Sequence, residues 1–595
     1  MKVLSRCFLG ISTLVLYFSF PVLGQELPLK WVPADSPVIV QLKGLGTSRN
    51  NLGKMVGNAF PDLAPKWIDQ VNKMIKDGFD GRKLDAINDK EPIIAFMPSL
   101  EKFQDSNNWV VILPVKSYES FCDTIMSKEE KKSLKKGKDG KNRIDEWTVE
   151  GKDDPLALID RKTHVLIAGS SETAQSLLKA KATIEKKIAD EVKSAFTQSD
   201  LSIYINIQSI YDAFKDQIDG FRGLVNIVLS GAGGQGLDKK QIEMIKSIVK
   251  TAINTVEDSL GLMMGLEFRP EGLSFKVLGQ VRAESDTNKF LKDFKTSSLN
   301  ELNQLPNEQM MYGVSQSSEK LNKALKSLTQ LATDEDEKAN DKILKALERL
   351  FDSGETIEVT CLPDLKKEMK VTTYKDAKKA VDALSDMFKS LTKTGQFNGA
   401  QLKDKPIFKE KAEKIGDIEF NYFSVKFDLD KILESNQQLP DSFKEAMKTM
   451  MTSLLGEELK MWYGLDGNQV ITLRADKFET AKKLYEQYKT GKNSLANNPG
   501  FQLTRKNLPE KATSISMINT SKFVAFFVDI VRATLNNIPG APISIPELTS
   551  VKGNAAYTGV AVVIKPSFAS FELFVPTTAM QQIRSMFAPL LAQDD

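Results

Sequence analysis

The sequence predicts an α+β fold in which mainly antiparallel sheets are covered by amphipathic helices. Two observations lead to this prediction. Residues from about 37 to 300 and from about 308 to 590 read as two copies of one unit, which predicts a tandem duplication with two similar lobes. Short Gly, Asp-Gly and Pro turns separate neighbouring apolar strands, and such turns favour β-hairpins over the crossovers of a parallel sheet.

The duplication is clearest where strand, turn and helix recur in the same order. The segment LALIDRKTHVLIAGSSETAQSLL from Leu156 matches MWYGLDGNQVITLRADKFETAKKLY from Met461. GLEFRPEGLSFKVLGQV from Gly265 matches AVVIKPSFASFELFVP from Ala561, with a basic residue and a proline between two alternating strands. We therefore predict a hairpin at each of these four places.

A strand followed by an apolar helix precedes each proline hairpin. LSIYINI from Leu201 leads into a helix with apolar residues at steps of three and four, namely Ile210, Phe214, Ile218, Phe221 and Leu224. TSISMI from Thr513 leads into a second helix with Phe523, Phe526, Phe527, Ile530 and Leu535. We predict that both helices cover a sheet.

Three further helices are predicted from spacing alone. Asp476 and Glu479 have capping-box spacing, so we expect Asp476 to cap a helix with the stripe Phe478, Ala481, Leu484 and Tyr488. Two more apolar stripes are Val381, Leu384, Phe388 and Leu391, and Met580, Ile583, Phe587 and Leu590.

The N-terminus has the features of a secretory signal peptide. Lys2 and Arg6 precede an apolar run, and small or β-branched residues lead up to Gly24. The sequence thus predicts a signal peptide over 1–24, a first half over 25–300 and a second half over 308–595, with retention of the signal as an anchor left open. Later segments lack about 20 uninterrupted apolar residues, so we expect an exported, periplasmic or extracellular protein that is not integral to the membrane after cleavage.

The net charge bears on the kind of partner, and the cysteine content bears on whether disulfides stabilise the chain. The signal segment holds Lys2 and Arg6 and no acidic residue, so the rest of the chain is nearly neutral, against +3 for the whole. This balance predicts no nucleic-acid partner. Beyond Cys7, only Cys122 and Cys361 remain, and we expect two separate buried thiols in place of a disulfide.

The chain has a single histidine, His164, within the strand THVLIAG. Ser-His-Asp and Cys-His nucleophile systems need a positioned imidazole, and zinc or iron sites are usually built from His and Cys clusters. We interpret His164 as a structural strand residue. The sequence therefore predicts no catalytic residue, no cofactor-binding residue, no metal ligand and no cofactor.

Two weaker motifs have ordinary structural explanations. Gly231, Gly233 and Gly236 form a GxGxxG string, but helical periodicity precedes it, which favours a loop between helices over a dinucleotide site. Asp428 and Asp430, and the acidic run 334–337, are interpreted as solvated turns and helix caps. A carboxylate pair in a glycosidase or a calcium site is the alternative interpretation.

A lysine-rich run, KEEKKSLKKGKDGKNR from Lys128, is the most biased segment. A solvated loop explains it, and contact with anionic lipid headgroups or acidic polysaccharide is the alternative. Asn519-Thr520-Ser521 matches the glycosylation tripeptide.

Three phrases carry a family resemblance: LPLKWVPADSPVIVQLKGL near the start, NNPGFQLTRKNLPEKATSISMINTSKFV, and the closing FELFVPTTAMQQI. With its hairpin-then-helix units, the chain resembles a class of large secreted proteins typical of planctomycete-type bacteria, which has no established activity. The resemblance implies export and a repeated α+β architecture, and it assigns a role to no residue.

These observations lead to three hypotheses of function. The first is a non-catalytic exported protein that acts through surface interactions with a protein or a cell-envelope component. The second is a carrier of a hydrophobic or lipid-like ligand, held in a cavity under the helices at Phe214–Leu224 and Phe523–Leu535. The third is a carboxylate-based hydrolase.

Overall fold

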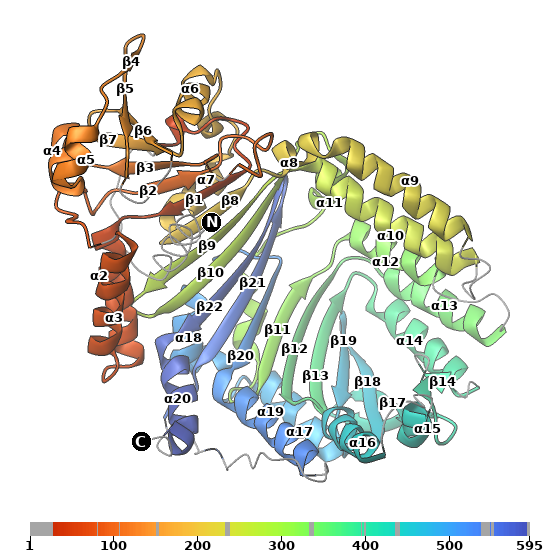
Figure 1. Cartoon of the computed structure of the whole chain (residues 1–595). Helices are drawn as coiled ribbons and strands as arrows, with labels where there is room; N and C mark the ends of the chain where they lie inside the picture. The colour runs from red at the N-terminus through yellow and green to blue at the C-terminus, as the bar shows by residue number, and fades with distance from the viewer. Residues whose placement is uncertain are drawn as a thin grey trace. The chain divides into compact units, whose positions relative to one another are not determined.

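The computed structural model confirms the α+β class (Figure 1). It describes residues 28–79, 81–105, 107–149, 154–231, 239–331, 338–393, 396–397, 400–434, 441–536, 548 and 553–591. Neighbouring strands of the large sheets pair antiparallel, as the hairpin turns predicted.

The described residues divide into two compact units. Unit 1 takes its residues from Met1–Val225, Lys250–Asn288 and Pro566–Glu572. Unit 2 takes its residues from Asn226–Val249, Lys289–Lys565 and Leu573–Asp595. The division passes through α9 (Lys215–Gly231), α10 (Lys239–Asp258), α11 (Asp286–Leu291) and β22 (Phe568–Pro576).

Unit 1 is built on one antiparallel sheet in the order β5-β6-β7-β3-β2-β1-β8-β9-β10, and the short β4 pairs with β5. The strands are β1 (Val38–Leu42), β2 (Ile93–Phe96), β3 (Val110–Pro114), β4 (Lys138–Asp139), β5 (Asn142–Trp147), β6 (Leu156–Asp160), β7 (His164–Ala168), β8 (Leu201–Ile205), β9 (Ser259–Arg269) and β10 (Gly272–Val281). The helices are η1 (Pro28–Trp31), α2 (Leu45–Ala59), α3 (Ala64–Gly78), α4 (Tyr118–Ile125), α5 (Lys128–Ser133), α6 (Ser171–Lys179), η2 (Ile184–Lys186), α7 (Asp190–Gln198) and α8 (Ile207–Ala213).

Two apolar cores lie on opposite faces of the unit 1 sheet. On one face, Ile39, Tyr204 and Met263 pack with residues of η1, α6, η2 and α7. On the other face, Phe121 of α4 packs with Leu158 and the neighbouring strand residues of β3 and β7. Burial of these side chains is the main stabilising contribution to the unit.

Unit 2 has a sheet in the order β16-β17-β18-β19-β13-β12-β11-β20-β21. Its strands are β11 (Met311–Gln316), β12 (Thr356–Asp364), β13 (Lys367–Tyr374), β16 (Ile407–Ile415), β17 (Ile418–Lys426), β18 (Glu458–Asp466), β19 (Gln469–Arg474), β20 (Ser514–Asn519) and β21 (Tyr557–Lys565), with a separate small hairpin of β14 (Gln396–Phe397) and β15 (Ala400–Gln401). Its helices are η4 (Asn300–Gln304), α12 (Glu319–Leu331), α13 (Lys338–Phe351), α14 (Ala377–Leu391), α15 (Leu429–Glu434), α16 (Asp441–Leu455), α17 (Phe478–Thr490), η5 (Leu495–Asn497), α18 (Pro499–Lys506), α19 (Thr520–Leu535) and α20 (Thr577–Leu591).

The unit 2 sheet is also covered on both faces, but not over its whole area. Residues of η4, α17, η5 and α18 form the main core with Tyr312, Val371 and Phe420. On the opposite face, Phe388 of α14 stacks on Phe423 with ring centroids 4.2 Å apart. The predicted stripe of α14 is therefore confirmed as a core contact.

The two units share an order of strands and several equivalent backbone hydrogen bonds. The run β5-β6-β7-β3-β2-β1-β8-β9 in unit 1 has the same connectivity as β17-β18-β19-β13-β12-β11-β20-β21 in unit 2. The Ile184 amide donates to the Val32 carbonyl at 2.9 Å, and the Leu495 amide donates to the Leu305 carbonyl at 2.7 Å. These pairs fix which residues of the two units correspond.

The asparagines that follow β8 and β20 show the same correspondence at the side-chain level. Asn206 caps α8 and accepts from the Ser209 amide at 3.1 Å, whereas Asn519 caps α19 and accepts from the Lys522 amide at 3.3 Å. Each asparagine thereby satisfies an amide of the first helical turn that has no partner within its helix.

The prediction that a helix from Ile210 to Leu224 covers a sheet is wrong. α8 ends at Ala213 and α9 begins at Lys215, and Phe214, Phe221 and Leu224 are 43%, 55% and 59% exposed. Arg222 of α9 pairs with Glu257 of α10 at 2.7 Å, which holds α9 along α10 and not on strands. The periodicity identified the apolar face of the helix correctly, but it carries no information about what covers that face.

The boundaries of α19 agree with the predicted helix, but its apolar face is not covered by a sheet either. Ile530 is buried, but Phe527 and Val531 are 39% and 44% exposed. α19 lies chiefly against α16 and α20 and contacts β20 only slightly. The expectation that this helix covers a sheet is therefore wrong as well.

The predicted capping box before α17 does not form. Lys477 occupies the N-cap position and no side chain caps the helix. Because the helix begins at Phe478, Asp476 lies one residue too early and Glu479 lies in the first turn, where its charge still favours the helix dipole.

Candidate ligand-binding face

Rows of apolar side chains cross one face of the unit 1 sheet. In the middle row, Val40 lies opposite Ile203, and Ile203 lies opposite Met264. Met264 lies in turn opposite Val277. Directly paired residues of antiparallel strands point to the same side, so these four side chains project from one face. Each of them is partly exposed.

A further row lies on each side of the middle row. The rows are Val38, Ile205, Leu262 and Gly279, and Leu42, Leu201, Leu266 and Phe275. Leu42 and Leu201 are buried, whereas the other members are partly exposed. The apolar surface therefore continues across four neighbouring strands.

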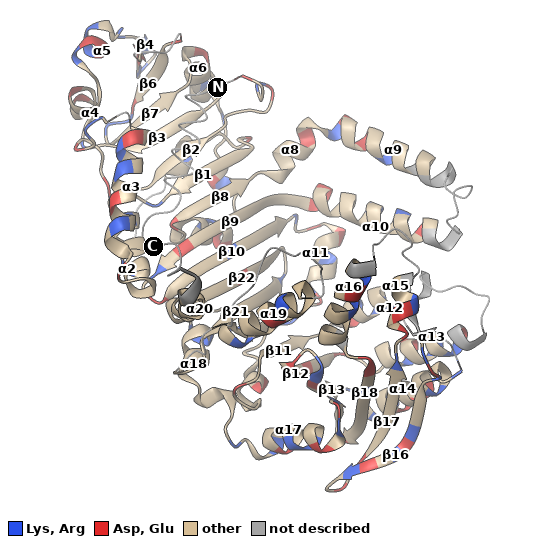
Figure 2. Ribbon diagram, turned by 60° about the horizontal axis from the view of Figure 1, so that its bottom comes forward, with Lys and Arg blue, Asp and Glu red and all other residues tan. Residues whose placement is uncertain are grey.

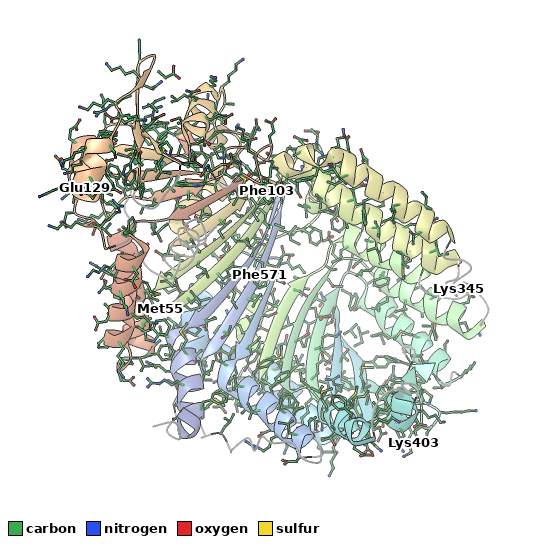
Figure 3. All side chains as sticks on the ribbon, in the orientation of Figure 1. Met55, Phe103, Glu129, Lys345, Lys403 and Phe571 are labelled. Carbon is green, nitrogen blue, oxygen red and sulfur yellow. The ribbon has the colours of Figure 1, made fainter. Side chains whose placement is uncertain are left out.

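Phe571, which also belongs to unit 1, extends this surface. Lys276 and Glu572 form an ion pair at 3.0 Å, and Phe568 packs against the core on that same side of the sheet. Successive residues of a strand point to opposite faces, so Phe571 projects on the side of Phe275 and Val277. Figure 3 labels Phe571 among the strands, and its side chain is 39% exposed.

We call this surface the apolar face. It consists of Val38, Val40, Ile203, Ile205, Leu262, Met264, Leu266, Phe275, Val277 and Phe571. From strand spacing and rise, its three rows span about 14 Å across and about 14 Å along the strands. None of its side chains is charged or hydrogen-bonding, and Figure 2 shows β8 and most of β9 in the colour of uncharged residues.

The described helices of unit 1 contact the apolar face at its borders. Over β3 and β7 the same side of the sheet is covered by α4, with Val165 and Ile167 in the core. α2 covers Phe268 at the far end of β9, and α8 lies at the opposite end of that strand (Figure 1).

The corresponding surface of unit 2 is more polar. The strand registers and the shared hydrogen bonds place Gly313, Ser516 and Thr558 where unit 1 has Val40, Ile203 and Leu262. Val560 and Val562 of β21 remain apolar. A sheet of this connectivity therefore does not need large apolar residues at these positions in order to fold.

A cavity of about 1080 Å³ lies in unit 2, between α12, α13 and the start of α14. Most of its lining residues are polar or charged, and two pairs of its charges are neutralised within the lining: Lys295 with Glu355 at 2.6 Å and Lys323 with Glu319 at 2.7 Å. The residues that line it do not come from the apolar helices under which the sequence placed a ligand cavity.

His164 lies on β7, largely buried, with its ring edge against Trp31 at a centroid distance of 4.9 Å. Burial, with a smaller contribution from Lys30, lowers the pKa of His164 to about 4. The Glu91 carboxylate, with Oε2 3.6 Å from Nε2, opposes this shift, but burial predominates. The imidazole is therefore neutral near neutral pH and packs as a strand residue.

We expect His164 to make stability depend on pH. Because the pKa is lower in the folded than in the unfolded chain, the stabilisation is complete above pH 6.5 and is lost as the pH falls through about 4. His164→Val removes the titratable imidazole and leaves an apolar, β-branched residue that suits a buried strand. Urea unfolding at about pH 7 and pH 4 measures how much the free energy of unfolding decreases with acidification. We expect this decrease to be smaller in the variant than in the unaltered protein, by up to ~3 kcal/mol. Equal pH dependence of the two proteins would refute this role.

Cys122 and Cys361 are both free, as the sequence predicted. Cys361 is buried on β12, as expected, whereas Cys122 on α4 is only half-buried, where we expected a buried thiol. Burial raises the pKa of Cys122 to about 11 and raises that of Cys361 as well. Neither thiol is activated as a thiolate nucleophile.

The other candidate motifs lie apart from the apolar face. Gly231 ends α9, a helix and not a strand, while Gly233 and Gly236 lie outside the described residues, as does the acidic run 334–337. Asp428 accepts from the Lys431 amide at 3.2 Å as a helix cap, and Asp430 pairs with Lys448 at 2.5 Å. These two carboxylates thus have the structural roles expected of caps and solvated turns.

The glycosylation tripeptide is not an accessible site in the folded chain. Asn519 is 1% exposed and its side chain caps α19. Its amide has no space for a glycan in this conformation.

Searches of the described ranges give two further findings. No group of three or more His, Cys, Asp or Glu side chains is placed to hold a metal ion among these residues. Likewise, none of the helices in the described part of the chain is long and apolar enough to cross a membrane.

Sequence reasoning missed the apolar face, although a signal for it was present. β9 reads SLGLMMGLEFR, and β8 reads LSIYI, so apolar residues occur on both sides of each strand. Such runs are typical of strands that are covered on both faces. Here only one of the two faces has a full cover within unit 1.

The chain was also compared with known proteins. No model of a protein family, no curated protein and no solved structure matches it.

Proposed function

We propose that the protein is a non-catalytic, exported binding protein that holds an elongated apolar ligand, such as an acyl chain, on the apolar face of unit 1. One observation carries the proposal: a continuous, uncharged and partly exposed surface crosses β1, β8, β9, β10 and the start of β22. A polar ligand would leave its hydrogen-bonding groups without partners on such a surface. The chemistry of the face therefore favours a hydrocarbon.

The size of the face sets the expected affinity. A ligand that covers it buries about 200 Å² of protein and a similar area of its own, which contributes roughly 10 kcal/mol in gross terms. Association costs at least about 4 kcal/mol of this. We therefore expect a dissociation constant in the micromolar range, suited to a ligand that is exchanged and not permanently retained.

The proposal also includes an exported location and an origin of the two units by duplication. The N-terminal pattern of residues 1–24 and the resemblance to large secreted proteins support an exported location. We also infer that the two units derive from one ancestral unit, because their strand order and their Asn206 and Asn519 caps correspond. On this account, only unit 1 carries the ligand-binding version of the shared sheet face.

Interaction with another protein, the first hypothesis from the sequence, keeps one specific observation in its favour. Phe221 and Leu224 project from α9 and are more than half exposed. Large exposed apolar side chains that cluster on one helix are typical of contact surfaces. This helix is separate from the apolar face, so the two proposals can be tested independently.

A photoreactive fatty acid with a diazirine on its acyl chain provides the test. After ultraviolet exposure and proteolysis, we expect labelled peptides from β1, β8, β9 and β10. Unlabelled fatty acid in excess is the control and should suppress the labelling. Labelling confined to α9 would support the alternative contact surface, and the absence of specific labelling would refute the proposal.

A further inference from the structure

The lysine-rich run of unit 1 forms one projecting structure. Residues 128–143 fold as the short helix α5 followed by the β4-β5 hairpin. Figure 1 shows the hairpin at the periphery of unit 1, and Figure 3 labels Glu129 of α5 at its outer edge. All seven lysines of the run are exposed: Lys128, Lys131, Lys132, Lys135, Lys136, Lys138 and Lys141.

Nearby carboxylates do not neutralise these lysines, because two of them are turned inward. Glu130 is buried, closes the capping box with Ser127 and binds Arg82 through two hydrogen bonds of 2.7 and 2.8 Å. Asp145 is fully buried and accepts hydrogen bonds from Arg143 and Tyr118. Their charges are satisfied within the protein and are screened from the surface.

Among the residues that the structure describes, two of the seven lysines have an ion-pair partner. Lys131 approaches Asp123 at 3.3 Å, and Lys135 approaches Glu146 at 4.0 Å. The remaining five form no ion pair with any residue in the described ranges: Lys128, Lys132, Lys136, Lys138 and Lys141. Glu129 and Asp139 are the exposed acids of the run, so a net positive charge faces solvent.

At the corresponding edge of unit 2, exposed lysines do not produce a net positive charge. The β16-β17 hairpin also carries exposed lysines, but Lys411 pairs with Glu419 at 2.8 Å and Glu410 pairs with Lys389 at 2.5 Å. Charge is balanced there. The uncompensated charge is thus a property of the unit 1 hairpin and not of the shared architecture.

We propose that the α5–β4–β5 projection docks on an anionic phospholipid surface. Lysine is a compact point charge that binds phosphate without fixed geometry, which suits a fluid array of headgroups. The run contains no aromatic residue to stack on bases, which disfavours single-stranded nucleic acid. Clusters of four to eight basic residues are typical of contacts with anionic lipid. The proposal does not rest on the apolar face.

Sedimentation with lipid vesicles tests the docking. The protein purified after export is mixed with vesicles of phosphatidylcholine alone, or with roughly one part in four of phosphatidylglycerol. We expect binding only to the anionic vesicles. Binding should also fall steeply as salt is raised, because the contact is between exposed charges. The variant K132Q/K136Q/K138Q/K141Q should bind the anionic vesicles at least about tenfold more weakly.

The control variant K405Q/K409Q/K411Q/K414Q removes as many charges from the β16-β17 hairpin and should bind like the unaltered protein. Circular dichroism checks that both variants are folded. Equal loss of binding in both variants, or no binding to anionic vesicles, would overturn the proposal. Stronger competition by soluble polyphosphate than by the same phosphate on vesicles would reassign the surface to a free polyanion and would overturn it as well.

Discussion

Replacing Ile203 by Ser and Leu262 by Thr is expected to weaken the binding of an acyl probe to the protein by about 100-fold. Each change removes a large apolar side chain from the apolar face and introduces a hydroxyl that hydrocarbon cannot satisfy. We expect the fold to be kept, because Ser516 and Thr558 occupy the corresponding positions of the unit 2 sheet. Fluorescence titration with a labelled fatty acid measures the affinity, and thermal unfolding checks the fold.

A matched pair of changes in unit 2 provides the control. The changes are Val560→Ser and Val562→Thr. Both valines lie on the corresponding face of β21, and each change replaces an apolar side chain by a hydroxyl-bearing one. These changes should leave the affinity unchanged within about twofold. An equal loss of affinity in the two double variants would place the ligand elsewhere and contradict the proposal.

Replacing Asp145 by Ala is expected to lower the free energy of unfolding by about 3–5 kcal/mol, the largest effect of a single change that we predict. Asp145 is fully buried and accepts hydrogen bonds from Tyr118 Oη at 2.8 Å, Arg143 Nε at 2.9 Å and the Gly137 amide at 3.2 Å. Its removal leaves a guanidinium and a phenol without their shared acceptor. Urea unfolding followed by circular dichroism measures the change.

Asp139 provides the comparison for this prediction, because it belongs to the same hairpin but is exposed. Asp139→Ala should change the stability by no more than about 0.5 kcal/mol. If Asp145→Ala were equally mild, the buried cluster would not be the anchor of the hairpin. The orientation of the lysine-rich projection would then need another explanation.

The elements that local signals define were predictable from the sequence. The turn between Asp160 and Thr163 and the Arg269-Pro270 turn are each flanked by alternating apolar residues, and each joins paired strands in the structure. Alternation with a period of two fixes which side of a strand is buried, because a slip by one residue would expose the core. The register of these hairpins therefore follows from short stretches of chain.

The surroundings of helices were not predictable in this way. The stripe of α14 and that of α9 look alike in sequence, yet Phe388 is buried and Phe221 is exposed. Whether the apolar face of a helix is buried depends on the element that packs against it. α14 packs on the sheet, whereas α9 is held along α10 by the ion pair of Arg222 and Glu257. The cap of α17 failed for a different reason, because a shift of one residue in the helix start moves Asp476 out of capping position.

The apolar face was hidden because its residues come from strands that are distant in sequence. Val40, Ile203 and Met264 become neighbours only through the order β1-β8-β9. The prediction of no catalytic or metal-binding residue did not need the fold. It followed from composition, because a chain with one histidine and few cysteines lacks the side chains from which most such sites are built. Composition thus says more about the kind of site than about its position.

Native mass spectrometry of the protein, followed by organic extraction, tests the central claim most directly. The purified protein should first be equilibrated with a fatty acid in excess, because a ligand of micromolar affinity exchanges and is lost during purification. We predict an added mass that is released by organic solvent, contains acyl chains, and is absent when Ile203 and Leu262 carry the changes described above. A bare polypeptide mass in the unaltered protein, or an added mass that persists in that variant, would contradict the account.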